Sequence, residues 1–165
     1  MALDRRVMAA TATVFFLSES APARGETAMS FALSTGQYGM RKEVPHALAL
    51  DVQLRAPWRW GVLHPMGGLL ATTTGSAFVY SGVAIELELS RHLLLTPGFA
   101  PGVVLAGADD LGSPLEFRSS LELLIAPTER LRVGISFSHL SNGGLGDRNP
   151  GVETLMLGVA FRPGG

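Results

Sequence analysis

The chain has 165 residues, with 13 basic and 14 acidic side chains and no cysteine. This length suits a single domain, and the formal charge of −1 argues against a general nucleic-acid binder, which would carry a basic excess. The lack of cysteine excludes a disulfide framework and a thiolate metal site.

The first segment has the pattern of a secretory signal peptide. A charged stretch at 4–6 precedes an apolar run over 7–17, and a small-x-small site follows at 21–23. The apolar run is too short for a transmembrane helix, which takes about 20 residues. We therefore expect 1–23 to be a signal peptide with an approximate cleavage site, and 24–165 to form one barrel domain. A disordered or membrane-anchored N-terminus is the alternative.

Period-2 alternation of apolar and polar residues recurs along the mature chain and predicts eight β-strands. The expected strands span residues 29–38, 46–54, 58–70, 78–89, 92–105, 115–125, 131–141 and 153–161. The connections at 55–57, 90–91 and 126–130 are tight, and those at 39–45, 71–77, 106–114 and 142–152 are longer. Short turns at one end and long loops at the other are typical of an outer-membrane β-barrel.

The two faces of the expected strands decide between two kinds of barrel. A soluble lipocalin-like barrel has an apolar interior, whereas a membrane barrel has a polar interior and an apolar wall. The polar faces mix small residues with Asp, Glu and Arg, which fit and pair inside a narrow eight-stranded barrel. A soluble exterior would more often carry lysine, and Lys42 is the only one. We expect an all-β, antiparallel transmembrane barrel, with the soluble barrel as the alternative.

Some features fit a barrel less well. Proline and glycine interrupt the strands expected at 58–70 and 92–105 and weaken their ladders. Aromatic residues make up only 7% of the chain, although Trp58 and Trp60 fall beside an expected turn, where an interfacial girdle would lie. The chain ends in FRPGG, and Phe161 takes the place of the usual terminal aromatic residue.

Three polar residues lie on the apolar faces of the last two expected strands. The outward face of 131–141 is apolar up to Phe137 and ends with His139 and Ser141. Glu153 begins the apolar face of the following strand, so all three side chains are expected at one height on the outer wall. A charged side chain facing lipid costs up to ~2–4 kcal/mol at mid-depth and less near the interface. Three such residues together indicate a site.

Serine, histidine and an acid are the residue types of a nucleophile, its base and the group that orients the base. The glycine-rich loop after Ser141 offers donors for an oxyanion. The candidate donors are the side chains of Asn142 and Asn149 and the backbone amides of Gly143, Gly144 and Gly146. A lone histidine at a strand end is more often an interfacial residue, so these residues leave the enzyme and the structural barrel equally open.

The stretch SHLSNGGLGDRNPGVE at 138–153 closely resembles the lipid A 3-O-deacylases of Gram-negative outer membranes, the PagL family. It carries H-x-S-N, a glycine-rich loop and N-P-G-x-E, and GSPLEFRSSLEL at 112–123 is similar as well. The resemblance implies an integral outer-membrane enzyme, with its site toward the outer leaflet, that hydrolyses the ester-linked acyl chain at position 3 of lipid A. It implies Ser141 as nucleophile, His139 as base and Glu153 as orienting acid, and it implies no metal or cofactor.

Within this resemblance, Asn149 is the expected oxyanion donor, and Asn142 is a second donor or a structural residue. The expected partner is lipid A or lipopolysaccharide in the outer membrane, and no nucleic acid is expected. Two other functions remain open on the sequence alone. One is a non-enzymatic barrel of the adhesin or structural type, and the other is an outer-membrane phospholipase or acyltransferase. Oligomeric state, acyl-chain preference and regulation are not fixed by the sequence.

Overall fold

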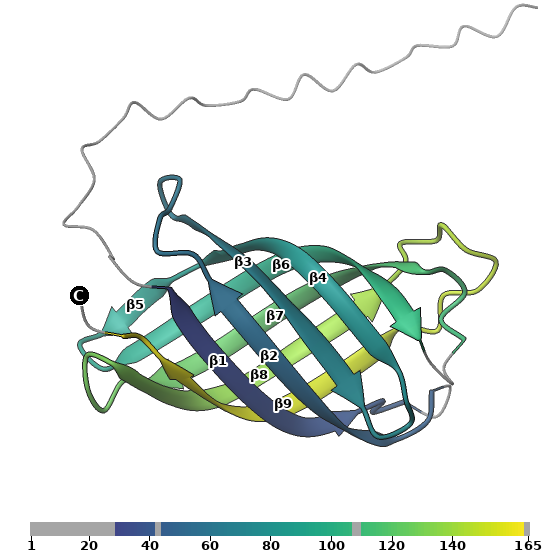
Figure 1. The fold of residues 1–165 in the computed structure, drawn as a ribbon, viewed down its shortest axis with the longest axis horizontal. Coiled ribbons are helices and arrows are strands. Elements are labelled where there is room, and N and C mark those ends of the chain that lie inside the picture. The colour runs from purple at the N-terminus through teal and green to yellow at the C-terminus, as the bar shows by residue number, and fades with distance from the viewer. Residues whose placement is uncertain (1–28, 42–43, 107–109, 164–165) are drawn as a thin grey trace, which may run out of the picture.

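The computed structural model describes residues 29–41, 44–106 and 110–163, so the expected signal peptide lies outside the described residues. The described chain forms a closed antiparallel β-barrel in which β1 pairs with β9 (Figure 1). Its strands are β1 (Ser30–Tyr38), β2 (Ala47–Arg55), β3 (Leu63–Thr72), β4 (Ala77–Ile85), β5 (Leu87–Ser90), β6 (Leu93–Ala106), β7 (Leu115–Ile125), β8 (Leu131–Ser141) and β9 (Val152–Phe161). Because β4 and β5 both pair with β6, and the register is the same from Phe78 to Glu88, the described residues make eight barrel strands, as expected.

Two prolines explain why the strand expected over 78–89 is divided. The register places Ser81 opposite Pro101 and Ile85 opposite Pro97, and the ladder to β6 is interrupted at both places. The second interruption lies next to the division between β4 and β5. Proline has no N–H to donate, so neither residue can complete the ladder on that side. On its other side, β6 pairs with β7 through both prolines without a break. The prolines therefore loosen one ladder without opening the barrel.

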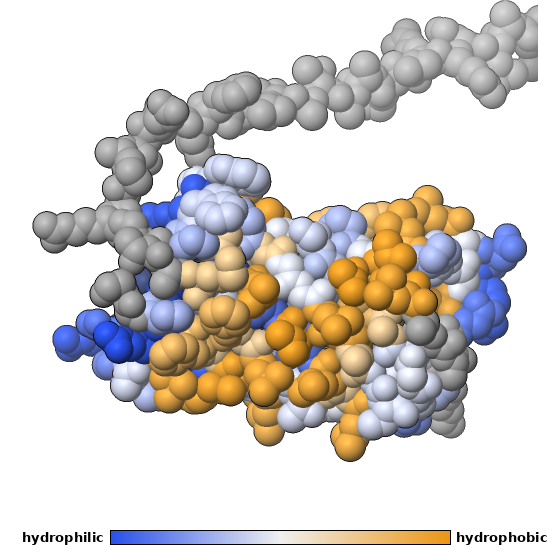
Figure 2. All heavy atoms as spheres, viewed as in Figure 1, coloured by the Kyte–Doolittle hydropathy of each residue, from blue (hydrophilic) through white to orange (hydrophobic). Residues whose placement is uncertain are grey.

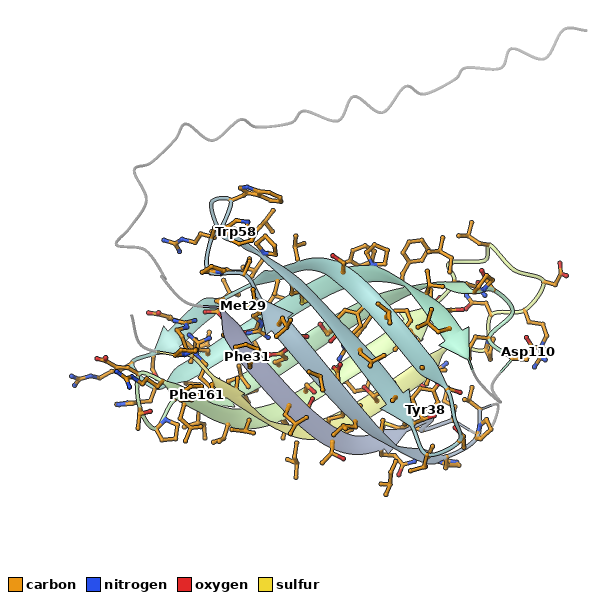
Figure 3. All side chains as sticks on the ribbon, viewed as in Figure 1. Met29, Phe31, Tyr38, Trp58, Asp110 and Phe161 are labelled. Atoms are coloured by element: carbon orange, nitrogen blue, oxygen red, sulfur yellow. The ribbon has the colours of Figure 1, made fainter. Side chains whose placement is uncertain are left out.

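The strand expected to begin at residue 58 begins instead at Leu63, so that boundary was wrong. Trp58 and Trp60 lie in the connection between β2 and β3, and a bridge between Trp60 and Leu63 closes its turn. Gly61 in this turn has a φ of 60°, which glycine adopts without strain. Trp58 is 57% exposed and lies at the end of the barrel where the described chain begins and ends (Figure 3), and Trp60 is 67% exposed. This position matches one interfacial aromatic girdle of a membrane barrel.

Alternation along the strands places apolar side chains on the outside of the barrel. In β2, burial alternates at every residue, with Leu48, Leu50, Val52 and Leu54 exposed and Asp51 and Gln53 buried. Apolar side chains cover the middle of the barrel, and hydrophilic residues gather at its ends (Figure 2). Monomeric soluble proteins rarely expose so large an apolar surface, whereas a bilayer covers it. The predicted inside-out pattern is therefore confirmed. In the described part of the chain, no helix could cross a membrane.

Paired charges line the interior of the barrel. Arg118 and Asp51 form a buried ion pair of 2.7 Å between Nη2 and Oδ2. The guanidinium of Arg118 lies 4.6 Å from the ring centroid of Tyr80, whose hydroxyl donates to Asp51 Oδ1 at 2.9 Å. Closer to the chain ends, Glu86 contacts three arginines, Arg55, Arg132 and Arg162. These pairs offset part of the cost of burying charge in a narrow lumen.

Candidate active site

His139 and Glu153 meet on the outer wall at the loop end of the barrel. The two residues are direct partners in the ladder between β8 and β9. Nδ1 of His139 lies 3.2 Å from Oε1 of Glu153. The imidazole is 39% exposed, whereas the carboxylate is only 8% exposed. The sequence placed both residues on one outward face at one height, and the structure brings them into hydrogen-bond contact.

The imidazole lies over Gly151, the glycine of the N-P-G-x-E motif. This glycine has a φ of 67°. A Cβ atom added to it would lie 2.9 Å from Cε1 of His139 and 3.6 Å from Nε2. The ring therefore needs the space that glycine leaves. With Nδ1 held by Glu153, Nε2 is the nitrogen left to accept a proton.

Ser141 lies on the same face as His139 but has other partners in this structure. Its Oγ lies 3.2 Å from Oδ1 and 3.0 Å from Nδ2 of Asn149, and it accepts from the backbone N–H of Gly143 at 3.2 Å. Among the described residues, no hydrogen bond joins Ser141 to His139. Residues i and i+2 of a strand are about 7 Å apart at their Cα atoms, so a rotation of Ser141 about Cα–Cβ turns its hydroxyl toward the imidazole.

Asn142 is buried within the loop and its side chain holds the loop together. Its Nδ2 donates to the carbonyl oxygens of Leu111 at 2.9 Å and Arg148 at 2.7 Å, and its Oδ1 accepts from Gly144 N at 2.9 Å. The side chain is fully buried and all its hydrogen-bonding groups are used. These contacts favour the structural alternative for Asn142 over the donor alternative. The amide of Gly144 is likewise directed at Asn142 and not at Ser141.

The backbone of the loop after β8 is in direct contact with the backbone of the loop before β7. A Cβ atom on Gly146 would lie 2.0 Å from the carbonyl oxygen of Gly112, so no other residue fits there without moving the backbone. Leu111 is buried beside this contact. The close approach fixes the loop that carries Asn149 relative to the end of β8.

Two residues near the imidazole were missed by the sequence argument. Ser119 of β7 is the ladder partner of His139 on the side away from Glu153, and it is exposed on the outer wall. Ser119 shares the outward face of β7 with Phe117 and Leu121, so the sequence pattern could have identified it as a polar residue within an apolar face. Arg41 reaches Glu153 from the end of β1, and no sequence pattern links these distant segments.

Arg41 completes an open groove over the carboxylate. Its Nη2 lies 2.7 Å from Oε1 of Glu153, and the groove is also lined by Met40, Phe137 and His139. The backbone beside it is held to β9, because Gly39 N donates to the carbonyl oxygen of Glu153 at 3.0 Å. Among the described residues, no cluster of three or more His, Asp or Glu side chains could hold a metal ion.

The family model described as lipid A 3-O-deacylase (PagL) matches residues 36–162, which include every residue of this constellation. The chain belongs to the PagL family. The sequence resemblance is thereby confirmed, and it extends over most of the chain and not only over the last strands. A search of curated protein sequences finds no match.

Solved structures share the fold of this PagL family member. The crystal structure of the outer membrane enzyme PagL has 17% sequence identity and a TM-score of 0.63, covering 80% of this chain and 98% of that chain. Neisserial surface protein A has 11% identity and a TM-score of 0.56, covering 82% and 96%. Ail of Yersinia pestis has 14% identity and a TM-score of 0.50, covering 81% and 99%. At these identities the likeness establishes the transmembrane barrel fold and no more.

Proposed function

We propose that this chain hydrolyses the ester bond that links an acyl chain to position 3 of lipid A. The observation that carries the proposal is the 3.2 Å contact between His139 and Glu153, on the same outward face as Ser141. An imidazole oriented by a carboxylate is a general base for a neighbouring hydroxyl. Membership of the PagL family supplies the substrate class.

In the first half of the reaction, Ser141 is the nucleophile. Its Oγ attacks the ester carbonyl carbon while Nε2 of His139 takes the hydroxyl proton, and Glu153 stabilises the imidazolium. The tetrahedral intermediate then collapses with loss of the sugar oxygen of position 3. This oxygen receives the proton from His139, and the acyl group stays on Ser141 as an ester.

In the second half, water replaces the sugar hydroxyl. His139 takes a proton from the water as its oxygen attacks the acyl carbonyl carbon. Collapse of this second intermediate releases the fatty acid, and the proton returns from His139 to Oγ of Ser141. The same base thus serves both halves, and no further group is needed to balance the protons.

Asn149 and Gly143 are suited to stabilise the oxyanion. Nδ2 of Asn149 and the backbone N–H of Gly143 lie 3.0 Å and 3.2 Å from Oγ of Ser141. When Oγ turns to the substrate, these two donors are left without it and can receive the negative oxygen instead. Donors fixed in place before the reaction lower the barrier most, and the packed loop fixes both.

The position of the site matches a substrate that stays in the membrane. His139, Ser141 and Glu153 face outward above an apolar wall, so a lipid reaches them by lateral diffusion and need not enter the lumen. Long loops of outer-membrane barrels are extracellular. We therefore place the loop end, and with it the site, in the outer leaflet.

The test is mass spectrometry of lipid A from a Gram-negative host that expresses either the intact chain or Ser141→Ala. We expect the intact chain to remove one acyl group from position 3, and the variant to leave lipid A unchanged. Unchanged lipid A in both strains, with a folded barrel in the outer membrane, would overturn the proposal. The phospholipids of the same cells are analysed in parallel, and their loss would indicate a phospholipase instead.

A further inference from the structure

Arg41 occupies a position that the acyl-transfer chemistry does not require. The base and its orienting carboxylate are complete with His139 and Glu153, yet Arg41 Nη2 lies 2.7 Å from the same Oε1 atom that His139 contacts at 3.2 Å. The other carboxylate oxygen, Oε2, is buried and has no hydrogen-bond partner among the described residues. Arg41 and His139 therefore share Oε1 of Glu153, and Arg41 makes the shorter contact.

The guanidinium of Arg41 retains donors that are open to the outside. Its side chain is 60% exposed, although that of its ion-pair partner, Glu153, is only 8% exposed. Guanidinium has five N–H donors in a planar fork, and Glu153 uses only one edge of it. Arg41 lines the open groove together with Met40 and Phe137, so its remaining donors are available to a ligand there.

The groove combines this positive charge with apolar flanks. Met40 is 48% exposed and Phe137 is 44% exposed, so both present apolar surface beside the guanidinium. A ligand that fits such a groove carries an anionic group next to acyl chains. Lipid A has this chemistry, because its acylated disaccharide also bears phosphate groups, and arginine binds phosphate through paired N–H donors.

We propose that Arg41 is a substrate-docking residue that binds a phosphate group of the lipid, and that this contact releases Glu153 to His139. This inference rests on the proposed function and deepens it by naming what recognises the headgroup. In the free protein, Arg41 neutralises the buried carboxylate. In the complex, phosphate replaces the carboxylate at Arg41, and Oε1 of Glu153 is left to Nδ1 of His139 alone.

Arg148 provides a matched control. It is also 60% exposed at the loop end, and it also forms an ion pair, with Nη1 lying 2.9 Å from Oδ2 of Asp110. Its carboxylate partner is 70% exposed, and Arg148 does not line the groove. Replacement of Arg148 with glutamine removes an arginine of the same exposure without touching Glu153.

The test is equilibrium binding by the full-length chain carrying Ser141→Ala, so that binding is measured without turnover. The probes are bisphosphorylated lipid A and the same lipid after phosphatase treatment, each in micelles of one neutral detergent. We expect the Ser141→Ala chain to prefer the phosphorylated lipid by about tenfold or more, the size of one charge-assisted hydrogen-bond pair. Arg41→Gln should abolish that preference, Arg41→Lys should retain part of it, and Arg148→Gln should leave it unchanged.

Two outcomes would overturn the inference. One is an equal loss of affinity for both lipids in Arg41→Gln, which would mean that Arg41 only supports the local structure. The other is a phosphate preference that survives Arg41→Gln. Hydrolysis is measured separately, with the intact Ser141 chain acting on lipid A and on a neutral para-nitrophenyl acyl ester. Failure to hydrolyse lipid A would overturn the proposed function. The binding result would still decide whether Arg41 binds phosphate.

Discussion

Glu153 lies directly opposite His139 across the ladder between β8 and β9, with its Oε1 atom 3.2 Å from Nδ1 of the imidazole. Backbone hydrogen bonds of two adjacent strands therefore set the distance between the proposed base and its acid. Ser141 is placed differently, because its hydroxyl is held by Asn149 from the following loop. The strands of the wall thus position the base and its acid, and the loop positions the nucleophile. Mutations can separate these two contributions.

The substitution Ser141→Ala should reduce ester hydrolysis by at least about 10³-fold, because no other hydroxyl takes over the role of an activated nucleophile. Alanine is smaller than serine, so the methyl group fits the half-buried position of Ser141 without a clash. Turnover of lipid A and of a neutral ester is measured for purified protein. Heat-dependent mobility on gels checks in parallel that the barrel is folded.

Ser119→Ala is the control for this experiment. Ser119 is the other ladder partner of His139, so a hydroxyl near the imidazole is removed while Ser141 is kept. We expect turnover within about twofold of the unchanged chain, because Ser119 is exposed on the wall and has no part in the proposed reaction. Loss of turnover in Ser119→Ala together with activity in Ser141→Ala would exchange the roles of the two serines.

Glu153→Gln should lower kcat by about 10²- to 10⁴-fold and leave the fold intact. The amide has the shape of the carboxylate but cannot stabilise the imidazolium, and its NH₂ group would favour the wrong tautomer of His139. Steady-state kinetics on a neutral ester measures the effect, since that substrate does not depend on phosphate docking. A change confined to KM would contradict the proposed role of this residue.

The arrangement of the strands could largely be predicted from alternation alone. The strands around the site, 115–125 and 131–141, have the bounds that the pattern predicts, since one face of each meets lipid and the other meets a polar lumen. The start of β3 could not be predicted in this way. Trp58, Trp60 and Val62 continue the alternation, although the chain turns at Gly61.

The site could be predicted only in part. Parity placed His139, Ser141 and Glu153 on one face, because strand geometry fixes the face and height of every residue. Side-chain rotamers are not fixed by parity, so the contact between Ser141 and Asn149 could not be foreseen. The contact of Arg41 with Glu153 depends on how the first loop folds over the closing seam of the barrel.

Asn149→Ala should lower kcat by about 10²- to 10³-fold with little change in stability, because it removes one proposed oxyanion donor from an exposed side chain. Asn142→Ala should act differently. It leaves the carbonyls of Leu111 and Arg148 without their buried donor, so the loop should open at a cost of about 1–3 kcal/mol. Limited proteolysis of the loop distinguishes the two. A cleaved loop in Asn149→Ala would count against its catalytic role.

Gly151→Ala should reduce kcat by about 10- to 100-fold, since the new methyl group would meet Cε1 of His139 at 2.9 Å and displace the imidazole. Gly61→Ala is the matched control, because Gly61 has a φ of 60° and its new methyl group would enter open space. Both substitutions strain the backbone, but only Gly151→Ala places a methyl group against His139. Equal kinetic losses in both variants would show that general loosening of the barrel explains the effect.

Arg118→Met tests whether the charged lumen serves stability alone. Removing Arg118 leaves Asp51 buried without its 2.7 Å partner, which should lower the free energy of unfolding by about 3–5 kcal/mol. The double variant Asp51→Leu with Arg118→Met should recover most of this loss, because both charges of the pair are removed together. Urea unfolding in detergent measures stability, and ester hydrolysis is assayed where every variant is folded. We expect turnover within about twofold throughout, since the ion pair lies inside the barrel and His139 lies on its outer wall. A drop in turnover in the restabilised double variant would mean that the lumen shapes the site through the wall.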